Sequence, residues 1–382
     1  MKNFTFSVPQ NIVVGRGSLS KLPELSKALG GTHGFIISGP HLNKMGLVDS
    51  CAQNLKNAGI SVDSFTETEG NPSVETVDKA TKAFKESGAD FIIALGGGSP
   101  MDVAKAVGVV AKYGGSITEY EGGGKVPGDI IPLIAIPTTA GTGSEVTAFS
   151  VITDHSRNYK LTVFSYKLIP AYAILDADLI TTAPVSVAAA CGIDAMVHAL
   201  EAYISTDSSP FSDAMAEKAL ELIGKNIRRY VANRADAEAA EGMLVGSLFA
   251  GIAFSWARLG DVHAMSHPVS AFFNVPHGVA NAILLPTVVE YNSLADNGKY
   301  LKIYNYISTT PLNKEEFEPL MLVSLLEELN ASLGIPACLG DVGVTEDKFD
   351  AMADDAMKSG NVAVNPRSTT KKDILMLYKK AL

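Results

Sequence analysis

The chain has 382 residues, 47% of them hydrophobic and 19% charged, a composition that excludes disordered and fibrous proteins and predicts two domains, or three. The formal net charge of −10 comes without a long acidic run or a basic patch, which argues against nucleic-acid and anionic-membrane partners. The three cysteines are widely spaced, and neither the N-terminus nor any later segment offers the apolar run of a signal peptide or of a membrane span, about eighteen residues. We therefore expect a soluble cytoplasmic protein.

Short apolar runs and amphipathic stretches alternate in the first half of the chain. The runs predict strands at 34–38, 60–65, 90–95, 132–137 and 172–176, and the stretches predict helices at 74–88 and 101–115. Such alternation is typical of an α/β domain with a mostly parallel, Rossmann-like sheet. After the segment 178–184 only helical periodicity remains, so we predict an α/β domain over 1–180 and an all-α domain over 181–382.

A glycine cluster, 96–98, joins the strand at 90–95 to the next helix. We expect Ser99 to be the N-cap, Pro100 the first helical residue and Asp102 the acidic partner of a capping box, so that the exposed amides bind a pyrophosphate. By itself the cluster fits a tight turn equally well. A second loop follows the strand at 132–137, and two loops at the carboxyl ends of parallel strands favour a nucleotide site.

The second loop, 136–149, is rich in small hydroxyl side chains around Gly141 and Gly143. Its hydroxyls include Thr138, Thr139 and Thr147. Small residues of this kind allow a ligand to approach the backbone and offer donors to its phosphates.

Asp194 and His198 are four residues apart on a predicted helix, so both face one side and can reach one divalent cation. The alternative is a solvated acid beside a histidine, but the apolar neighbours of this pair make solvation of the carboxylate difficult.

Three of the seven histidines lie in "VHAMSHPVSAFFNVPHG", at 263, 267 and 277. His263 and His267 repeat the four-residue spacing, Pro268 should end or kink their helix, and His277 lies in a turn bracketed by proline and glycine. There are two interpretations. Either these histidines have separate structural roles, or some of them bind one cation together with Asp194 and His198. Imidazole and carboxylate ligands of this kind suit Fe(II) or Zn(II).

Five motifs occur in order along nearly the whole chain: "GGGSPMDVAKA", "PTTAGTGSEVT", "ILDADL", "CGIDAMVHALEAY" and "GDVHAMSHPVSAFFNVPHGVANAILLP". In these motifs the sequence resembles the iron-dependent (group III) alcohol dehydrogenases. The resemblance implies a dinucleotide-binding N-terminal domain, a helical catalytic domain, a metal in the interdomain cleft, and a homodimer or larger homo-oligomer.

The resemblance also implies roles for individual residues. It places the metal ligands at Asp194, His198, His263 and His277, and a non-ligand histidine near nicotinamide and substrate at His267. It places the cofactor contacts at Asn71, Gly97, Gly98, Ser99, Thr138, Thr139, Gly141, Thr147, Phe149 and Lys160.

The chemistry implied is hydride transfer between a nicotinamide and a small aldehyde or primary alcohol whose oxygen is polarised by the metal. Ethanol, propanediol, lactaldehyde and sulfoacetaldehyde are the candidate substrates. The alternative is a zinc enzyme of the same fold that is similar to dehydroquinate synthase or to glycerol dehydrogenase.

Two positions depart from the family pattern. Gly39 replaces the aspartate that meets the ribose of NAD, so a 2′-phosphate is not repelled and NADP is not excluded. No arginine lies beside Gly39 either, and its absence favours NAD weakly. Arg258 either makes a structural ion pair or binds an anionic substrate tail.

Overall fold

The computed structural model describes residue 6, residue 8, and residues 10–157 and 159–382. Contacts divide the chain into two compact units. The sheet unit comprises Val8–Thr139 and Ser144–Ile180, and the helical unit comprises Ala140–Gly143 and Thr181–Leu382 together with Phe6. The N-terminal stretch from which we expect no signal peptide lies largely outside the described residues, so that expectation stays a prediction.

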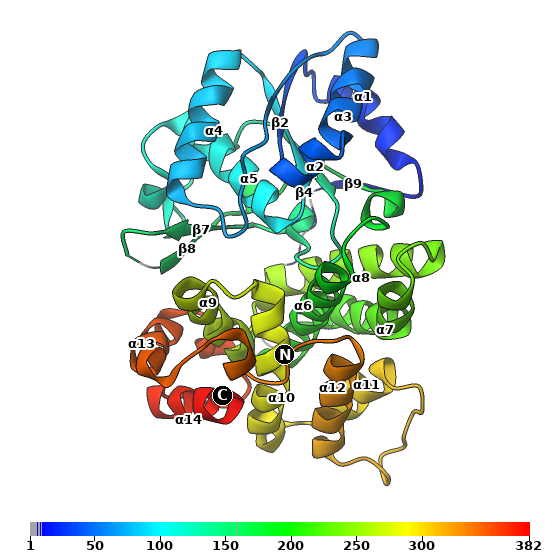
Figure 1. Ribbon diagram of the computed structural model, residues 1–382, viewed down its shortest axis with the longest axis vertical. Helices are drawn as coiled ribbons and strands as arrows, with labels where there is room; N and C mark the ends of the chain where they lie inside the picture. Colours follow the sequence, from blue (N-terminus) through cyan, green and yellow to red (C-terminus); the bar gives the residue numbers. More distant parts are fainter. Residues whose placement is uncertain (1–5, 7, 9, 158) are drawn as a thin grey trace. The chain divides into compact units, whose positions relative to one another are not determined.

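A six-stranded parallel sheet forms the centre of the sheet unit (Figure 1), in the order β1-β9-β6-β4-β2-β3. Its strands are β1 (Asn11–Val14), β2 (His33–Ile37), β3 (Ser61–Phe65), β4 (Phe91–Gly96), β6 (Leu133–Pro137) and β9 (Tyr172–Leu175). The Rossmann-like α/β prediction is confirmed, and each of the five predicted strands is present. Of the strands of this sheet, the sequence analysis missed β1, a short edge strand.

A second, smaller sheet has the order β5-β8-β7. It contains β5 (Gly122–Gly123) and the antiparallel pair β7 (Phe149–Asp154) and β8 (Tyr159–Phe164). The sequence analysis missed this sheet because β7 directly follows the hydroxyl-rich loop, and the predicted loop included its first residue, Phe149. The second loop leads into the strand β7.

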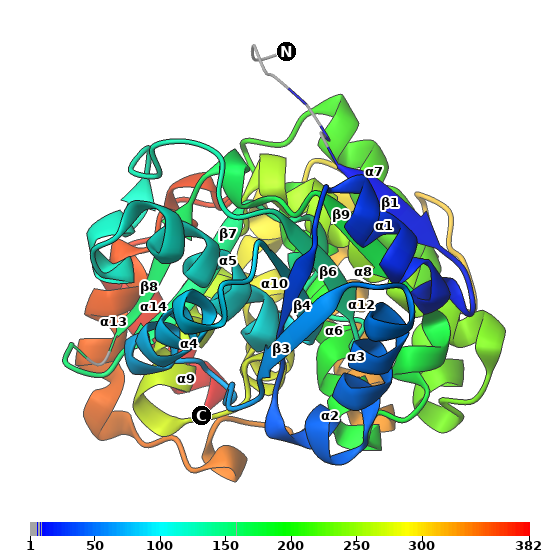
Figure 2. The same cartoon turned by 90° about the horizontal axis from the view of Figure 1, so that it is seen from above.

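Helices cover both faces of the large sheet (Figure 2). On one face α4 and α5 pack around Phe35, Val77 and Val107, and on the other α1 and α3 pack around Leu22, Leu55 and Ile93. These side chains are buried on both faces, as expected for a parallel sheet between two helical layers. The helices are α1 (Leu22–Ala28), α2 (Pro40–Lys44), α3 (Leu47–Asn57), α4 (Val74–Ser87) and α5 (Gly98–Tyr113).

The start of α5 differs from the prediction. Gly97 is the N-cap and Gly98 the first helical residue, and no side chain caps the helix. Ser99 is therefore inside the first turn, and Asp102 is not a capping-box partner: its carboxylate instead accepts hydrogen bonds from the Ser144 hydroxyl and the Val151 amide. A buried partner in the second loop outcompetes the local cap.

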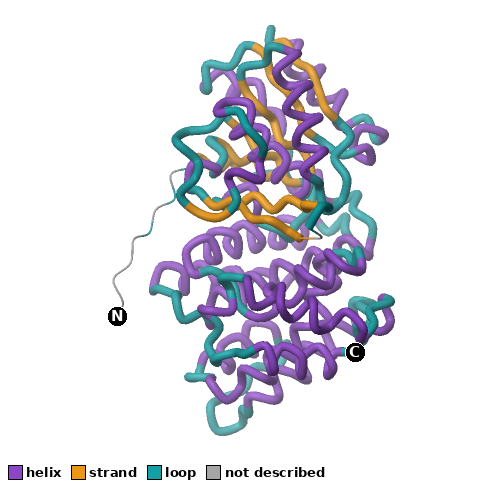
Figure 3. Tube along the Cα trace, turned by 90° about the vertical axis from the view of Figure 1, so that its left-hand side faces the viewer, coloured by secondary structure: helices purple, strands orange, loops and turns teal. Residues whose placement is uncertain are grey.

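The described part of the helical unit contains helices and short helical turns but no strand (Figure 3). Its α-helices are α6 (Val185–Ile204), α7 (Pro210–Ala232), α8 (Ala237–Ala257), α9 (Asp261–Phe273), α10 (His277–Asn292), α11 (Lys299–Ile307), α12 (Pro319–Ser332), α13 (Phe349–Lys358) and α14 (Lys371–Ala381). By length and composition α6 and α8 would each suffice to cross a membrane, yet 78% and 67% of their apolar windows are buried inside the protein, as in core helices.

Pro268 does not end its helix. The helix α9 continues from Asp261 through Pro268 to Phe273, so the predicted end of the helix is wrong, and a kink at Pro268 stays a prediction. Pro268 lacks one amide donor and is buried among the helices of this unit, where packing outweighs the lost hydrogen bond.

Candidate metal centre

Three helices of the helical unit supply the four predicted ligands. Asp194 and His198 lie one turn apart on α6, His263 lies on the first turn of α9, and His277 is the first residue of α10. His277 is thus at a helix start rather than in the preceding turn. Asp194, His198 and His263 are buried, and His277 is partly exposed.

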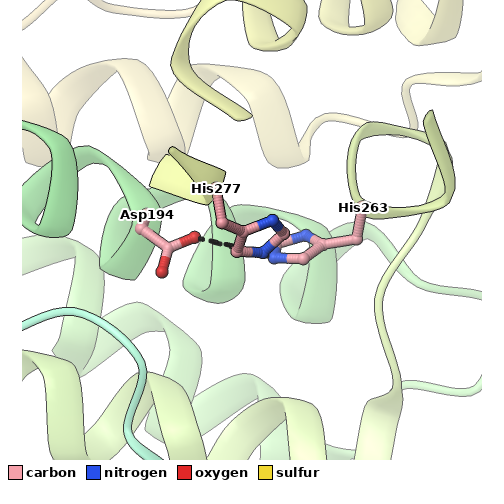
Figure 4. A group of neighbouring side chains, drawn as sticks. All are labelled: Asp194, His263 and His277. Atoms are coloured by element: carbon pink, nitrogen blue, oxygen red, sulfur yellow. Dashed lines mark ion pairs between the residues drawn. The ribbon is translucent and has the colours of Figure 1, made fainter. Parts of the chain in front are cut away.

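One carboxylate oxygen is the centre of the group. Oδ1 of Asp194 lies 4.0 Å from Nε2 of His198, 3.8 Å from Nε2 of His263 and 3.9 Å from Nε2 of His277. Asp194, His263 and His277 form a compact set whose ligand atoms all lie within 4.8 Å of one another (Figure 4). His198 faces the same oxygen but is not a member of that compact set.

The Nδ1 atom of His198 is held by the backbone. It lies 3.2 Å from the carbonyl oxygen of Gly141, which can only accept, so Nδ1 carries the proton and Nε2 keeps its lone pair toward Asp194. The ring is also stacked on Phe254, with centroids 4.5 Å apart. Both contacts fix the orientation that a metal ligand needs.

Glu201 does the same for His263. Its Oε2 lies 2.6 Å from Nδ1 of His263, and its Oε1 accepts a hydrogen bond of 2.7 Å from the Val262 amide. Burial raises the pKa of Glu201 to about 7. Burial, together with the nearby His198, lowers the pKa of His263 well below its usual value, so this imidazole is neutral, the form in which histidine binds metals.

Asn281 completes the polar centre. Its Nδ2 lies 2.6 Å from Oδ1 of Asp194 and 3.1 Å from Nε2 of both His263 and His277. The amide group has two hydrogens and therefore donates to at most two of these three atoms at a time; all three atoms face Nδ2.

The group fits a divalent ion. Ligand atoms about 2.0–2.2 Å from a four-coordinate ion lie roughly 3.3–3.6 Å from one another, and the separations from Asp194 of 3.8 to 4.0 Å differ by a few tenths of an ångström. Among the described residues no lysine or arginine pairs with the buried Asp194 carboxylate. Such a carboxylate facing three imidazoles has the chemistry of a cation site.

His267 lies beside this centre and outside it. Its ring centroid is 5.1 Å from that of His277 and 6.2 Å from that of His263. His267 is partly exposed, one turn after the buried His263 on α9. His267 therefore lies next to the proposed metal ligands His263 and His277 but is not a member of the compact set.

The predicted cofactor loops lie side by side in the sheet unit. Gly96 pairs with Pro137 in neighbouring parallel strands, and the Thr138 amide donates to the Gly96 carbonyl. A Cβ at Gly97 would lie 3.0 Å from the Thr139 hydroxyl, so glycine makes room for the close approach of the two loops. Gly98 and Ser99 follow in the first turn of α5.

The remaining predicted contacts form two further groups. The Lys160 ammonium donates to Oδ1 of Asn71 at 2.7 Å, which joins two residues distant in the sequence. Thr147 is buried, and both its hydroxyl and its carbonyl accept from Lys105, as does the carbonyl of Phe149. Gly141 belongs to the helical unit, where its carbonyl contacts His198.

Arg258 has an unusual backbone. Its φ is 63° and its ψ −168°, a region that only glycine adopts readily. Its guanidinium lies against Gly360, where a Cβ would be 2.0 Å from Nη2. Among the described residues no carboxylate makes an ion pair with it, so the structural ion pair considered from the sequence is not found.

Sequence reasoning missed Glu201, Asn281 and Lys105. Each is a polar residue inside an otherwise apolar helical stretch: Glu201 lies in "HALEAYI", for example, and Asn281 in "GVANAILL". A buried polar group needs a partner, and that was the available signal.

Comparison with known proteins shows the family. A family profile described as iron-containing alcohol dehydrogenase matches residues 9–177, and the profile of the C-terminal part of the Fe-containing alcohol dehydrogenase family matches residues 188–382. The chain belongs to the iron-containing alcohol dehydrogenase family.

Named relatives extend over the full length. A 1,3-propanediol dehydrogenase of Citrobacter freundii is 37% identical over 99% of this chain and 98% of its own. A lactaldehyde reductase of Escherichia coli is 37% identical over 96% of both chains. The crystal structure of a 1,3-propanediol oxidoreductase superposes with a TM-score of 0.95 at 36% identity, covering 100% of each chain.

Membership of the iron-containing alcohol dehydrogenases makes this chain an oxidoreductase of the alcohol dehydrogenase and aldehyde reductase class. It also supports a divalent metal at the group around Asp194.

Proposed function

We propose that this enzyme interconverts short aldehydes and primary alcohols by hydride transfer to and from NAD, with Fe(II) held by Asp194, His198, His263 and His277. The observation that carries the proposal is the convergence of three imidazole Nε2 atoms on one buried carboxylate oxygen, in a chain of this family. Zn(II) is the second candidate, because the ligand set suits both ions.

When bound, the ion supplies Lewis-acid polarisation of the substrate oxygen. The chain supplies orientation and proton handling. Glu201 and the Gly141 carbonyl keep the Nδ1 protons of His263 and His198 in place, so that the ligand nitrogens stay deprotonated. Phe254, near the end of α8, and Leu259, just before α9, are each 8% exposed and form apolar surroundings in the chain before the ligand His263.

We assign the proton transfer to His267. His267 lies beside the proposed metal ligands. One of its ring nitrogens takes the proton of the substrate hydroxyl during alcohol oxidation and returns it to the substrate oxygen during aldehyde reduction. The nearness of its ring to that of His277 supports this role.

The dinucleotide belongs to the two loops at the carboxyl ends of β4 and β6. Glycine at 97 allows close approach, and the first turn of α5 offers amides to a pyrophosphate through Gly98 and Ser99. Thr138, Thr139, Gly141, Thr147, Phe149, Lys160 and Asn71 are the further proposed contacts. Gly39 brings no carboxylate that would repel a 2′-phosphate, and no arginine beside it would bind one. We propose NAD on the absence of that arginine.

The proposal is tested by an activity assay. The enzyme is stripped of metal, reloaded with Fe(II) or Zn(II), and assayed with NADH and with NADPH. The aldehyde panel contains neutral propanal, 3-hydroxypropanal and lactaldehyde, and anionic sulfoacetaldehyde to test Arg258. We expect NADH oxidation with a neutral short aldehyde; a preference for NADPH would overturn the cofactor assignment. No turnover of any member with either metal would overturn the function.

Three single variants test the division of roles. His263→Ala and His277→Ala should lose metal, whereas His267→Ala should keep it and lose about 100-fold or more in kcat. Equal loss of metal in all three, measured by chelator competition, would contradict the assignment of His267.

We further propose a cytoplasmic homodimer or larger homo-oligomer. Light scattering after size exclusion measures the assembly, and a monomer at micromolar concentration would contradict it.

A further inference from the structure

Each of the three ligand-bearing helices presents two polar side chains that are four residues apart. These pairs are, on α6, α9 and α10 in turn, Asp194 and His198, His263 and His267, and His277 and Asn281. Residues at this spacing lie on one face of a helix. Five of the six have a proposed role as a metal ligand or in proton transfer, and Asn281 is the sixth.

The amide nitrogen of Asn281 lies among the proposed ligand atoms. The side chain is 0% exposed. Its Nδ2 is 2.6 Å from Oδ1 of Asp194 and 3.1 Å from Nε2 of both His263 and His277. Among the described residues it makes no hydrogen bond with the fourth proposed ligand, His198. One nitrogen is therefore in contact with three of the four ligand atoms.

The amide oxygen of Asn281 is buried and has no hydrogen-bond partner among the described residues. A buried acceptor without a partner is unfavourable, and an apolar side chain would avoid that cost. The amide hydrogens, in contrast, face a carboxylate and the lone pairs of two imidazoles. The contacts of Nδ2 therefore account for a polar residue at this position.

The same contacts define one side of the ligand set. A four-coordinate ion has four faces, each bounded by three ligands, and a fifth ligand such as a substrate oxygen enters through one of them. We call the face bounded by Asp194, His263 and His277 the amide face. Ligand atoms lie about 2.0–2.2 Å from a bound ion, so a nitrogen within 3.1 Å of all three leaves no room for a further ligand on the amide face.

His267 lies next to two of the histidines that bound the amide face. Its ring centroid is 5.1 Å from that of His277 and 6.2 Å from that of His263. A second face, bounded by these two histidines and His198, shares the same edge. Because Asn281 closes the amide face, the second face is the one that leaves a substrate oxygen within reach of His267.

We propose that Asn281 is a positioning residue of the metal centre. Its amide donates to Asp194 and keeps that carboxylate oxygen among the imidazoles. Its side chain closes the amide face, so that the substrate oxygen enters beside His267. This inference rests on the proposed function, because it requires a divalent ion at these ligands. Asn281 acts through the ligands and takes no part in hydride or proton transfer.

The test compares Asn281→Leu with Asn281→Ala in the Co(II)-loaded protein. Both variants lose the amide donor, but leucine keeps a branched side chain over the amide face, whereas alanine leaves space for a water molecule. We expect both variants to bind Co(II) and Zn(II) at least tenfold more weakly than wild type, measured by chelator competition. Only Asn281→Ala should lose intensity in its visible absorption spectrum, because a ligand added beyond the fourth weakens the absorption of Co(II).

Asn330→Leu is the matched control. Asn330 is also a buried asparagine of the helical unit, but its amide donates to the Ala282 carbonyl rather than to a proposed ligand. This variant should keep the metal affinity and the spectrum of wild type. If Asn281→Ala does not fold, the equally small Asn281→Ser replaces it in the spectral comparison.

Two results would overturn the inference. One is wild-type metal affinity in Asn281→Leu. The other is a visible spectrum that changes equally, or not at all, in Asn281→Leu and Asn281→Ala. Failure of the wild type itself to bind Fe(II), Zn(II) or Co(II) would instead overturn the proposed function.

Discussion

Glu201 decides which nitrogen of His263 faces the metal centre. The carboxylate accepts from the Val262 amide with one oxygen and contacts Nδ1 of His263 with the other. A carboxylate serves both donors, whereas a glutamine has one acceptor and one donor end. Glutamine must therefore lose the Val262 hydrogen bond or favour the tautomer whose Nε2 is protonated.

We predict that Glu201→Gln binds Fe(II) and Zn(II) about 10–100-fold more weakly than wild type, the range measured for groups that orient metal ligands. Chelator competition measures the affinity, and the absorption spectrum of the Co(II)-loaded protein reports on the ligand geometry. Glu221→Gln, an exposed pair partner of Lys218 on α7, is the control. Unchanged metal affinity in Glu201→Gln would show that Glu201 is not needed for orientation.

Residue spacing made part of this centre predictable. The four-residue intervals at Asp194 and His198, and the resemblance at His263 and His277, named the side chains that the structure brings together. Glu201 was not predictable in its role, because its partner lies 62 residues away and no local pattern encodes that contact. Likewise, nothing in the sequence indicated the strained backbone of Arg258.

The start of α10 is held against α6 by a glycine. A Cβ on Gly278 would lie 2.4 Å from the Ala190 carbonyl oxygen, a backbone atom that cannot move aside alone. Ala190 is about one turn before Asp194, and Gly278 directly follows His277, so this helix contact sets how near the two ligands come.

We predict that Gly278→Ala lowers the free energy of unfolding by about 1–3 kcal/mol, as overpacking usually does, and weakens metal binding at least tenfold. Denaturant unfolding and metal titration measure the two effects. Gly70→Ala is the matched control, since a Cβ there meets nothing within 4 Å. A variant with lowered stability but full metal affinity would refute the link between this contact and the ligands.

Elements were predictable where one pattern dominated. The buried parallel strands and the amphipathic helix at α4 follow directly from apolar periodicity. Tertiary packing overrode local rules at Pro268, which stays inside α9, and at Asp102, which bonds Ser144 instead of capping α5. The β7 and β8 pair was missed because β7 starts inside the segment 136–149, which its hydroxyl side chains and glycines led us to read as one loop.

The stability of the whole molecule should depend on pH through its buried acids. Asp261 is 0% exposed, and burial raises its pKa to about 7, with the nearby Glu201 acting in the same direction. Because the folded protein binds this proton more tightly than the unfolded chain does, Asp261 contributes stability below its ordinary pKa of about 4. That contribution is lost as the pH rises through about 7.

We therefore predict that the metal-free protein is less stable at pH 8 than at pH 5 by an amount that Asp261→Asn reduces. The neutral amide keeps the size of the protonated acid and does not ionise. Guanidinium unfolding at both pH values measures the difference, with the exposed Asp350→Asn as control. An undiminished difference in Asp261→Asn would place its origin in other groups.

Residues 140–143 belong to the helical unit although the chain on both sides of them belongs to the sheet unit. The polypeptide therefore visits the helical unit once before it reaches α6, and this visit delivers the Gly141 carbonyl to Nδ1 of His198. A fragment cut at 180/181 would carry all four proposed metal ligands and still lack that carbonyl. The two units are thus not interchangeable modules: recombination that grafts this helical half onto a foreign nucleotide-binding half must bring the four-residue excursion with it.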